Sequence, residues 1–271
     1  MRQAGVLGFP VQHSLSPRIF TYLSQALETT LLYNLYEVPP NDLESFVRDR
    51  KQESNWVGCN VTVPHKIKIL KFIDELSPSA SRTNAVNVIH SVDGKWIGHN
   101  TDVSGFTKCV DSDLKHDHAV VFGTGGAARA VITALDSMGF SKISVIGRGE
   151  VFEKLDIGVS HSKVITEYSE VANLYVNATP VGMTGFGNEL IQPWSGLSIQ
   201  NKRAQVIDLI YKPPKTVFMK WAQSNGVPDA QNGLKMLLEQ ALDTWEIWFS
   251  SLPNRDVLTK ELMAELKRLM S

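Results

Sequence analysis

The stretch that decides the fold is Ala119-Val120-Val121-Phe122-Gly123-Thr124-Gly125-Gly126-Ala127-Ala128-Arg129-Ala130. Its apolar start predicts a strand, its glycines predict a tight turn, and the residues after them predict a helix that continues to Met138. A turn of this kind brings backbone N–H groups and a helix N-terminus to the pyrophosphate of a dinucleotide. The glycine spacing departs from G-x-G-x-x-G, but its place between a strand and a helix favours a dinucleotide-binding fold.

Further strands follow this turn and alternate with helices. They are predicted at Ile143–Ile146, Val164–Ile165, Leu174–Asn177 and Gln205–Leu209. The alternation indicates an α/β architecture with a doubly wound parallel sheet. The stretch from Asn177 to Met183 directly follows one of these strands, so we expect it to face the cofactor.

One arginine suggests which dinucleotide is bound. Arg148 lies about twenty residues past the glycine turn, where an acidic residue would bind the ribose 2′-hydroxyl of NAD. A guanidinium can instead hold the 2′-phosphate of NADP bidentately. The alternative is a solvated surface arginine, with Glu150 close by in the sequence. The sequence therefore favours NADP over NAD.

A second stretch, Gly58-Cys59-Asn60-Val61-Thr62-Val63-Pro64-His65-Lys66, carries candidate chemistry. An apolar strand ends before Pro64, because proline cannot donate to a sheet, and the pattern from Ile67 to Ile73 predicts a helix. Ligands of α/β proteins bind at the carboxyl ends of strands, which is where the polar side chains of this stretch fall. Lys66 is the first candidate for chemistry, and the alternative is an ordinary surface lysine. The polar residues of the stretch are Asn60, Thr62, His65 and Lys66.

Two serines precede a predicted helix near the N-terminus. After a strand from Val6 to Phe9, Ser16 is the predicted N-cap of a helix that has Pro17 at its first position. Ser14 and Ser16 place two hydroxyls beside that helix N-terminus, which suits a carboxylate. The alternative is that both serines only cap the helix. Asp102 also stands at a predicted helix start, where a cap is the usual role.

The C-terminal part is helical. An apolar stripe from Leu234 to Trp248 has helical spacing, so most of that helix is expected in the core. Gln240 falls close to the stripe, and a buried glutamine needs hydrogen-bond partners, which a polyhydroxylated ligand could supply. The last helix, Val257 to Met270, is amphipathic and is expected to pack on the first domain.

Composition narrows the class of protein. The 271 residues suffice for two domains, and 43% hydrophobic with 20% charged residues is typical of a soluble globular chain. Lys and Arg number 27 against 28 Asp and Glu, which argues against a nucleic-acid partner. The apolar runs are too short for a membrane span or a signal peptide. Cys59 and Cys109 are expected as buried thiols in a reducing cytoplasm. His116 and His118 lie in a polar stretch, residues 111–118, and are expected to be solvated.

Eight motifs occur in a specific order along the chain. They resemble those of the shikimate dehydrogenase family, NADP-dependent enzymes that reduce 3-dehydroshikimate to shikimate, and of its quinate/shikimate relatives. The resemblance runs from Gly8 to about Trp248 and implies a substrate-binding domain at 1–101, an NADP-binding Rossmann domain at 102–235, and C-terminal helices at 236–271 that return to the first domain. The motifs are His13–Pro17, Asn60–Lys66, Ala85–Asn87, Gly98–Asp102, the turn at Gly123, Asn177–Met183, Asp208–Pro213 and Gly233–Gln240.

The resemblance also implies a role for individual residues. Lys66 and Asp102 would form the catalytic pair, and Ser14 and Ser16 would hold the substrate carboxylate. The ring hydroxyls would meet Thr62, Asn87, Asp102 and Gln240, with Asn60, Thr101 and Tyr211 nearby. The cofactor would be lined by Gly123, Thr124, Gly125, Gly126, Ala127, Arg148, Thr179, Leu209 and Gly233, with Met236 near the nicotinamide.

Two departures from the family pattern flank Asn87. Many members have Gly at Asn84 and Thr at Val88, so the chain is expected to be a divergent member. The resemblance implies a cytoplasmic monomer or homodimer of the chorismate pathway of aromatic amino acid biosynthesis, with a small-molecule substrate and neither nucleic-acid nor membrane partners. Three alternatives stay open: a quinate or other cyclohexane-carboxylate dehydrogenase, a non-catalytic NADP-binding sensor, and a methylene-tetrahydrofolate type dehydrogenase, which explains the paired serines poorly.

Overall fold

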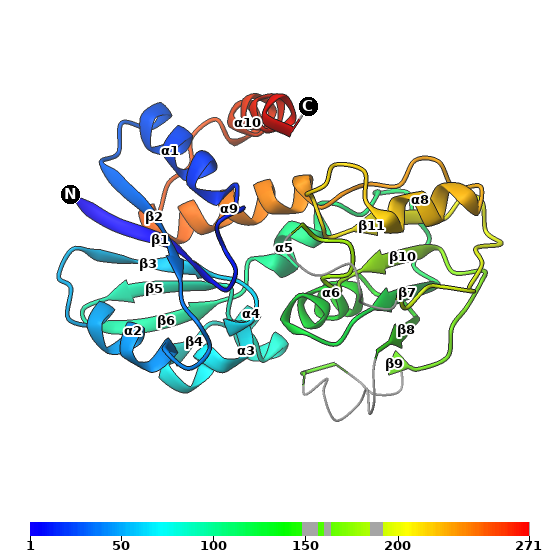
Figure 1. Cartoon of the computed structure of the whole chain (residues 1–271), viewed down its shortest axis with the longest axis horizontal. Helices are drawn as coiled ribbons and strands as arrows, with labels where there is room; N and C mark the ends of the chain where they lie inside the picture. Colours follow the sequence, from blue (N-terminus) through cyan, green and yellow to red (C-terminus); the bar gives the residue numbers. More distant parts are fainter. Residues whose placement is uncertain (148–156, 160–163, 185–191, 271) are drawn as a thin grey trace. The chain divides into compact units, whose positions relative to one another are not determined.

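The structure is a computed structural model that describes residues 1–147, 157–159, 164–184 and 192–270 (Figure 1). The chain forms two compact units. The first comprises Met1–Thr101 with Leu237–Leu269, and the second comprises Asp102–Met236. The chain therefore leaves the first unit after Thr101 and returns to it within one long helix.

The first unit is built on a mixed sheet. Within the described residues this sheet has six strands in the order β2-β1-β3-β5-β6-β4. β1 pairs in parallel with β2 and β3, whereas β5 is antiparallel to both β3 and β6. The strands are β1 (Arg2–Gly8), β2 (Leu31–Glu37), β3 (Trp56–Val61), β4 (Glu75–Leu76), β5 (Val88–Val92) and β6 (Lys95–His99).

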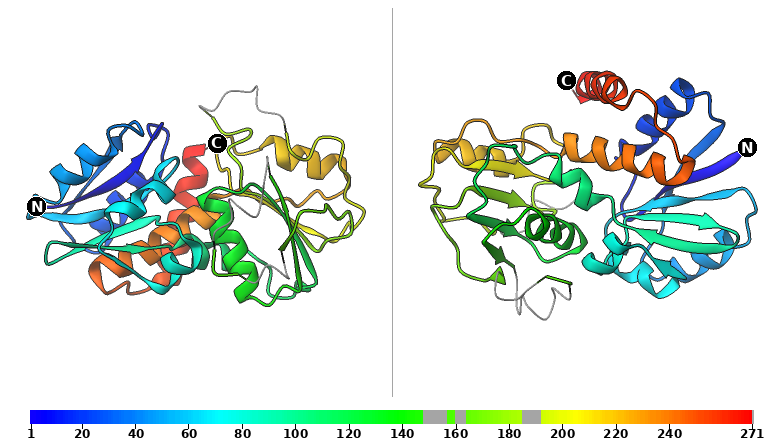
Figure 2. Two further views of the ribbon diagram at one scale, coloured as in Figure 1. Left: turned by 90° about the horizontal axis from the view of Figure 1, so that it is seen from below. Right: turned by 180° about the vertical axis from the view of Figure 1, so that it is seen from behind.

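Helices cover this sheet. Phe20 of α1 stacks on Tyr33 of β2 with ring centroids 4.3 Å apart, and Trp248 of α9 packs against both rings. α10 lies beside α1, where the Tyr22 hydroxyl donates to Glu261 at 2.7 Å (Figures 1 and 2). The helices are α1 (Ser16–Ala26), α2 (Leu43–Arg50), α3 (His65–Lys68), the 3-10 helix η1 (Ile69–Phe72), α4 (Pro78–Thr83), α9 (Leu234–Phe249, from Leu237 in this unit) and α10 (Arg255–Met270).

Two local predictions in this unit are wrong. The helix expected through Ile73 is a single α-helical turn, α3, that tightens into η1, where the Ile73 N–H donates to Leu70 only three residues back. Ser16 is not the N-cap: it is the first residue of α1, and Leu15 occupies the cap position without a side-chain bond. The Ser14 hydroxyl instead accepts the Ser16 N–H at 3.2 Å, so the capping hydroxyl comes from two residues earlier.

The second unit is a doubly wound parallel sheet, as predicted. In the part of the chain that the structure describes, it has five parallel strands in the order β11-β10-β7-β8-β9. The order reverses at β7, whose end at Phe122 pairs with Asn177 at the end of β10. Ligands of such sheets bind at this reversal. The strands are β7 (His118–Phe122), β8 (Lys142–Ile146), β9 (Val164–Ile165), β10 (Leu174–Asn177) and β11 (Gln205–Asp208).

Side chains alternate between the two faces of this sheet, as a strand requires. Val121 packs with Val131 and Leu135 of α6 on one face. Phe122 packs with Phe218 and Ala222 of α8 on the other. The sheet is thereby buried on both faces, which explains its continuous apolar strands. The helices are α5 (Asp102–Thr107), α6 (Gly126–Ser137) and α8 (Val217–Ser224).

The expectation of solvated histidines in residues 111–118 is wrong. His116 stacks on Phe140 with centroids 4.6 Å apart, and its Nδ1 bonds the Met138 carbonyl at 2.8 Å. His118 opens β7, lies 2.8 Å from the Ser144 hydroxyl, and has its pKa lowered by burial. Both rings are half-buried structural groups.

Neither a metal site nor a membrane span is found in the part of the chain that the structure describes. Among these residues, no group of His, Cys, Asp or Glu side chains could hold a metal ion. None of the helices in these ranges has the length and apolar character that crossing a bilayer requires. Both cysteines are buried thiols, as predicted.

Candidate active site

The carboxyl end of β3 holds a buried amide in a fixed orientation. The Asn60 side chain is buried, and its Oδ1 accepts the Tyr33 hydroxyl at 2.7 Å. Its Nδ2 donates to the Thr244 hydroxyl at 3.1 Å. A polar side chain at the end of a strand is placed to meet a ligand, and this one is held from both sides.

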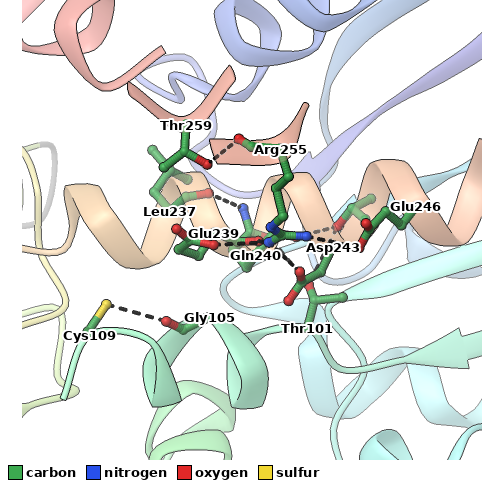
Figure 3. A network of polar contacts seen from close by, with 11 residues as sticks. Thr101, Gly105, Cys109, Leu237, Glu239, Gln240, Asp243, Glu246, Arg255 and Thr259 are labelled. Carbon is green, nitrogen blue, oxygen red and sulfur yellow. Dashed lines mark hydrogen bonds and ion pairs between the residues drawn. The ribbon is translucent and has the colours of Figure 1, made fainter. Parts of the chain in front are cut away.

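A second buried amide lies beside the start of β5. Asn87 donates to the Thr101 hydroxyl at 3.0 Å and accepts the Thr101 N–H at 2.7 Å. The Thr101 hydroxyl lies 3.5 Å from Gln240 Oε1, and Gln240 Nε2 donates to the Leu237 carbonyl at 2.8 Å (Figure 3). The Thr244 hydroxyl, which accepts the Asn60 amide, lies 3.4 Å from the Thr101 hydroxyl. The structure thus brings together four residues singled out in the sequence: Asn60, Asn87, Thr101 and Gln240.

Lys66 is tied to this network through its backbone. It is the second residue of α3, and its carbonyl accepts the Val86 N–H at 2.8 Å, next to Asn87. Its side chain is half-buried. Asp102, a buried residue, follows Thr101 in the chain and opens α5 in the second unit. A carboxylate at a helix start is favoured by the helix dipole.

His65 has a structural role. Its ring is buried, and burial lowers its pKa. Nε2 lies 2.7 Å from the Val38 carbonyl, so the neutral ring donates from this nitrogen. The imidazole thereby ties α3 to the end of β2.

Ser14 and Ser16 share one turn after β1. The Ser14 N–H donates to the Val11 carbonyl at 3.0 Å, and the Val11 N–H donates to Glu37 at 3.2 Å. Ser16 is buried and Ser14 is half-buried. The neighbouring Thr62 is half-buried, and its N–H donates to the Leu7 carbonyl at 2.8 Å.

The glycine turn of the second unit suits a phosphate. Gly123 has φ +119°, a conformation that favours glycine, and its N–H donates to the Ile146 carbonyl at 2.8 Å. Gly125 is the N-cap of α6, is exposed, and has nothing within 4 Å of the position that a Cβ would take. The first turn of α6 therefore offers accessible N–H groups beside open space, which fits the pyrophosphate of a dinucleotide. Thr124 and Ala127 flank this turn and are half-buried.

Two adjacent loops are braced to each other by polar side chains. Asn177 accepts both the N–H and the hydroxyl of Thr179, at 3.0 and 2.7 Å, and donates to Asp208 at 2.9 Å. Asp208 also accepts the Ile210 N–H at 3.0 Å. Burial raises the pKa of the Asp208 carboxyl to about 7, against hydrogen bonds that lower it. These hydrogen bonds fix the segments that follow β10 and β11, near the point where the strand order of the sheet reverses.

The residue before α9, Gly233, packs closely against the loop that follows β11. The Gly233 N–H donates to the Ile210 carbonyl at 3.0 Å, and a Cβ at Gly233 would lie 2.0 Å from the Leu209 carbonyl oxygen. Only glycine allows this approach. Met236 is buried in the core on the α6 side of the sheet, while Tyr211 is half-buried in the loop after β11. Arg148 lies outside the described residues.

The sequence did not identify two members of the polar network, Tyr33 and Thr244. Thr244 follows Gln240 by four residues, so the two side chains share one helix face, and this spacing was the available signal. Tyr33 is a buried tyrosine on a strand, whose hydroxyl needs a partner. The strand pattern does not reveal that the partner is Asn60.

Known proteins are similar to this chain in sequence. Residues 6–89 match the family model for the shikimate dehydrogenase substrate binding domain. The chain is 33% identical to the shikimate dehydrogenase (NADP(+)) of Desulforamulus reducens, over 97% of this chain and 95% of that protein. It is 34% identical to the shikimate dehydrogenase (NADP(+)) of Dictyoglomus turgidum, over 95% of each.

Solved structures agree over nearly the whole length. Shikimate dehydrogenase from Aquifex aeolicus matches with a TM-score of 0.81 at 31% identity, over 97% of both chains. Shikimate 5-dehydrogenase from Thermus thermophilus, in complex with NADP(H) and shikimate, matches with a TM-score of 0.76 at 29% identity, over 96% of this chain and 98% of that one. The fold is that of a two-domain α/β protein whose second unit is of the Rossmann type. The chain belongs to the shikimate dehydrogenase family.

Proposed function

We propose that this protein is an NADP-dependent shikimate dehydrogenase, which reversibly reduces 3-dehydroshikimate to shikimate. The observation that carries the proposal is the buried network of Asn60, Asn87, Thr101 and Gln240 in the first unit. Such a set of amides and a hydroxyl can match the several hydroxyls of a cyclohexane ring. Family membership and the shikimate and NADP(H) of the Thermus thermophilus complex support the same assignment.

Lys66 and Asp102 are the proposed catalytic pair. NADPH, when bound, supplies the hydride that reduces the ketone carbon of the substrate. Negative charge then builds on the ketone oxygen, where the Lys66 ammonium stabilises it and donates a proton. Asp102 is the proposed second member of the pair, and in the direction of alcohol oxidation the pair accepts the hydroxyl proton.

The remaining side chains of the first unit orient the substrate. Ser14 and Ser16 hold its carboxylate through their hydroxyls, at the start of α1. Thr62, Asn87 and Gln240 bind ring hydroxyls. Asn60 and Thr101 of the first unit and Tyr211, which belongs to the second unit, complete the proposed substrate set. The family match over residues 6–89, described as a substrate binding domain, supports this role for the domain formed by residues 1–101.

The second unit is the proposed NADP-binding domain, at residues 102–235. Its support is the exposed glycine turn at the start of α6, beside the switch point of the sheet. Residues 236–271 are proposed to act with the substrate domain, because they include the substrate residue Gln240. The proposed cofactor set is Gly123, Thr124, Gly125, Gly126, Ala127, Arg148, Thr179, Leu209, Gly233 and Met236.

Initial rates with four substrate pairs test the proposal. Shikimate and quinate are each incubated with NADP and with NAD, and the absorbance of the reduced nicotinamide is followed. We expect the highest kcat/KM with shikimate and NADP. A higher kcat/KM with quinate would favour quinate dehydrogenase, and cofactor binding without turnover on either alcohol would favour a sensor.

The proposed protein is a cytoplasmic monomer or homodimer. Light scattering on the purified protein measures its oligomeric state.

A further inference from the structure

One hydroxyl in α9 connects three of the proposed substrate residues. Thr244 is fully buried. Its hydroxyl donates to the Gln240 carbonyl at 2.8 Å, accepts the Asn60 amide at 3.1 Å and lies 3.4 Å from the Thr101 hydroxyl. The Gln240 bond anchors this hydroxyl to the backbone of α9, so its position affects the side chains of Asn60 and Thr101.

The oxygen of the Asn60 amide is held by Tyr33. The Tyr33 hydroxyl donates to Asn60 Oδ1 at 2.7 Å. Its ring cannot move easily, because it stacks on the buried Phe20 at an interplanar angle of 3°. The Asn60 amide therefore has its acceptor fixed by Tyr33 and its donor fixed by Thr244.

We propose that Thr244 and Tyr33 are positioning residues for the substrate, which act through Asn60 and Thr101. The inference rests on the proposed function and extends it to two residues outside the proposed site set. If these two positions only had to fill the core, valine in place of Thr244 and phenylalanine in place of Tyr33 would occupy a similar volume. The hydroxyls instead complete a satisfied buried polar network, which rigidifies the groups it connects.

The kinetic consequence follows from where these residues act. Without the Thr244 hydroxyl, the Asn60 amide loses a buried acceptor and can rotate away from the orientation that meets the ring. Orientation of a ring hydroxyl matters equally in the ground state and the transition state, so KM should rise while kcat stays close to wild type. We expect KM for shikimate to rise about tenfold, the usual scale for one buried hydrogen bond.

Four variants isolate the hydroxyl from the packing. Thr244→Val removes the hydroxyl at nearly constant volume, and Thr244→Ser keeps it. Tyr33→Phe removes the second hydroxyl and keeps the ring on Phe20. Thr133→Val is the matched control, because Thr133 is buried in α6 and, among the described residues, its hydroxyl has no hydrogen-bond partner.

Steady-state kinetics with shikimate and NADP, together with thermal unfolding, decide the question. Support would be a raised KM for shikimate in Thr244→Val and Tyr33→Phe, near-wild-type KM in Thr244→Ser and Thr133→Val, and an unchanged KM for NADP in all four. A purely structural role would lower the folded fraction, and therefore apparent kcat, without raising KM.

Three results would overturn the inference. The first is a wild-type KM in both hydroxyl-deletion variants. The second is a Thr244→Ser protein as impaired as Thr244→Val, which would mean that the hydroxyl is not what matters. The third is an apparent kcat that falls while KM is constant. If the wild-type protein itself fails to oxidise shikimate, the proposed function fails and this inference fails with it, whereas an active wild type with unaffected variants overturns this inference alone.

Discussion

Asn87 holds Thr101 through both ends of its amide, donating to the hydroxyl at 3.0 Å and accepting the backbone N–H at 2.7 Å. Both residues are buried, and Asp102 follows directly in the chain. The side chain of Asn87 therefore fixes the last residue of the first unit. A change at Asn87 should affect stability as well as substrate binding.

Replacing Asn87 with alanine tests this double role. In Asn87→Ala the Thr101 N–H loses a buried acceptor, which should lower the free energy of unfolding by about 1–3 kcal/mol. We also expect KM for shikimate to rise. Asn41→Ala, at an exposed position, is the control and should stay within about 0.5 kcal/mol of wild type. Denaturant unfolding of both variants measures the difference, and equal stabilities would contradict the structural role of Asn87.

Lys66 should act mainly in the transition state. We expect Lys66→Ala to lower kcat about 10²–10⁴-fold, the range for loss of a general acid, with a much smaller rise in KM. Lys68 lies on the same helix, α3, and its side chain is exposed, so Lys68→Ala should retain wild-type rates. Steady-state kinetics of the two variants provide the comparison. A Lys66→Ala protein with wild-type kcat would remove Lys66 from the mechanism.

Gly125 allows the cofactor site to be tested without unfolding the protein. Its φ of −79° suits alanine, and an added Cβ would meet nothing within 4 Å, so Gly125→Ala should keep the wild-type melting temperature. If a pyrophosphate occupies that space, KM for NADP should rise about tenfold or more while KM for shikimate stays constant. Unchanged cofactor affinity would place the phosphates elsewhere.

Gly233→Ala is the contrasting variant. Its Cβ would lie 2.0 Å from a backbone oxygen of Leu209, so something in the backbone must shift. We expect a lower melting temperature together with weaker NADP binding. Thermal unfolding of both variants, with and without NADP, provides the comparison. Without NADP, only Gly233→Ala should have a lower melting temperature than wild type.

Local sequence signals predicted the second unit well. The strand, glycine turn and helix from Ala119 to Met138 depend on neighbouring residues, so their pattern was sufficient to predict β7 and α6. The parallel order of the sheet follows from strands alternating with helices. By contrast, the stretch after Pro64 has apolar residues compatible with either an α-helix or a 3-10 helix, and tertiary contacts decided between them.

The site was predicted only in part, for a similar reason. The motifs identified Asn60, but its partners Tyr33 and Thr244 belong to β2 and α9, far away in the sequence. The periodicity of each element predicts that these residues are buried and not which hydroxyl meets which amide. Asp208 was likewise recognised as part of a motif, whereas its buried bonds to Asn177 and Ile210 come from the fold.

Arg255 is expected to stabilise the first unit by neutralising acidic side chains of α9. Its guanidinium lies 2.9 Å from Glu239, 2.5 Å from Asp243 and 2.9 Å from Glu246 (Figure 3). Arg255→Met would leave these carboxylates without this cation and close together, so the free energy of unfolding should fall by about 1–3 kcal/mol at neutral pH.

The control for Arg255 is another arginine of the same helix. Arg268 has an exposed side chain and forms a surface ion pair with Glu265 at 2.7 Å, so Arg268→Met should cost less than about 1 kcal/mol. Urea unfolding of both variants measures the difference. Equal effects would mean that the Arg255 cluster contributes no more than a surface pair.

Asp208 should make the stability of the second unit depend on pH. Burial raises the pKa of its carboxyl to about 7 in the folded protein, from an ordinary value of 3.8. Between these two values the folded state holds a proton that the unfolded state has lost. Its stabilising contribution is therefore complete below about pH 4, declines as pH rises, and is lost as pH passes through 7.

Asp208→Asn removes this titration and keeps an oxygen that can accept the Ile210 N–H and the Asn177 amide. From pH 5 to pH 7 we expect the wild type to lose stability relative to Asp208→Asn, by at most about 1.4 kcal/mol per pH unit, with no further relative change above pH 8. Melting temperatures of the two proteins across this range give the comparison. Parallel curves would show that the Asp208 carboxyl has the same pKa in the folded and unfolded states, and a relative gain with rising pH would mean that its hydrogen bonds outweigh burial.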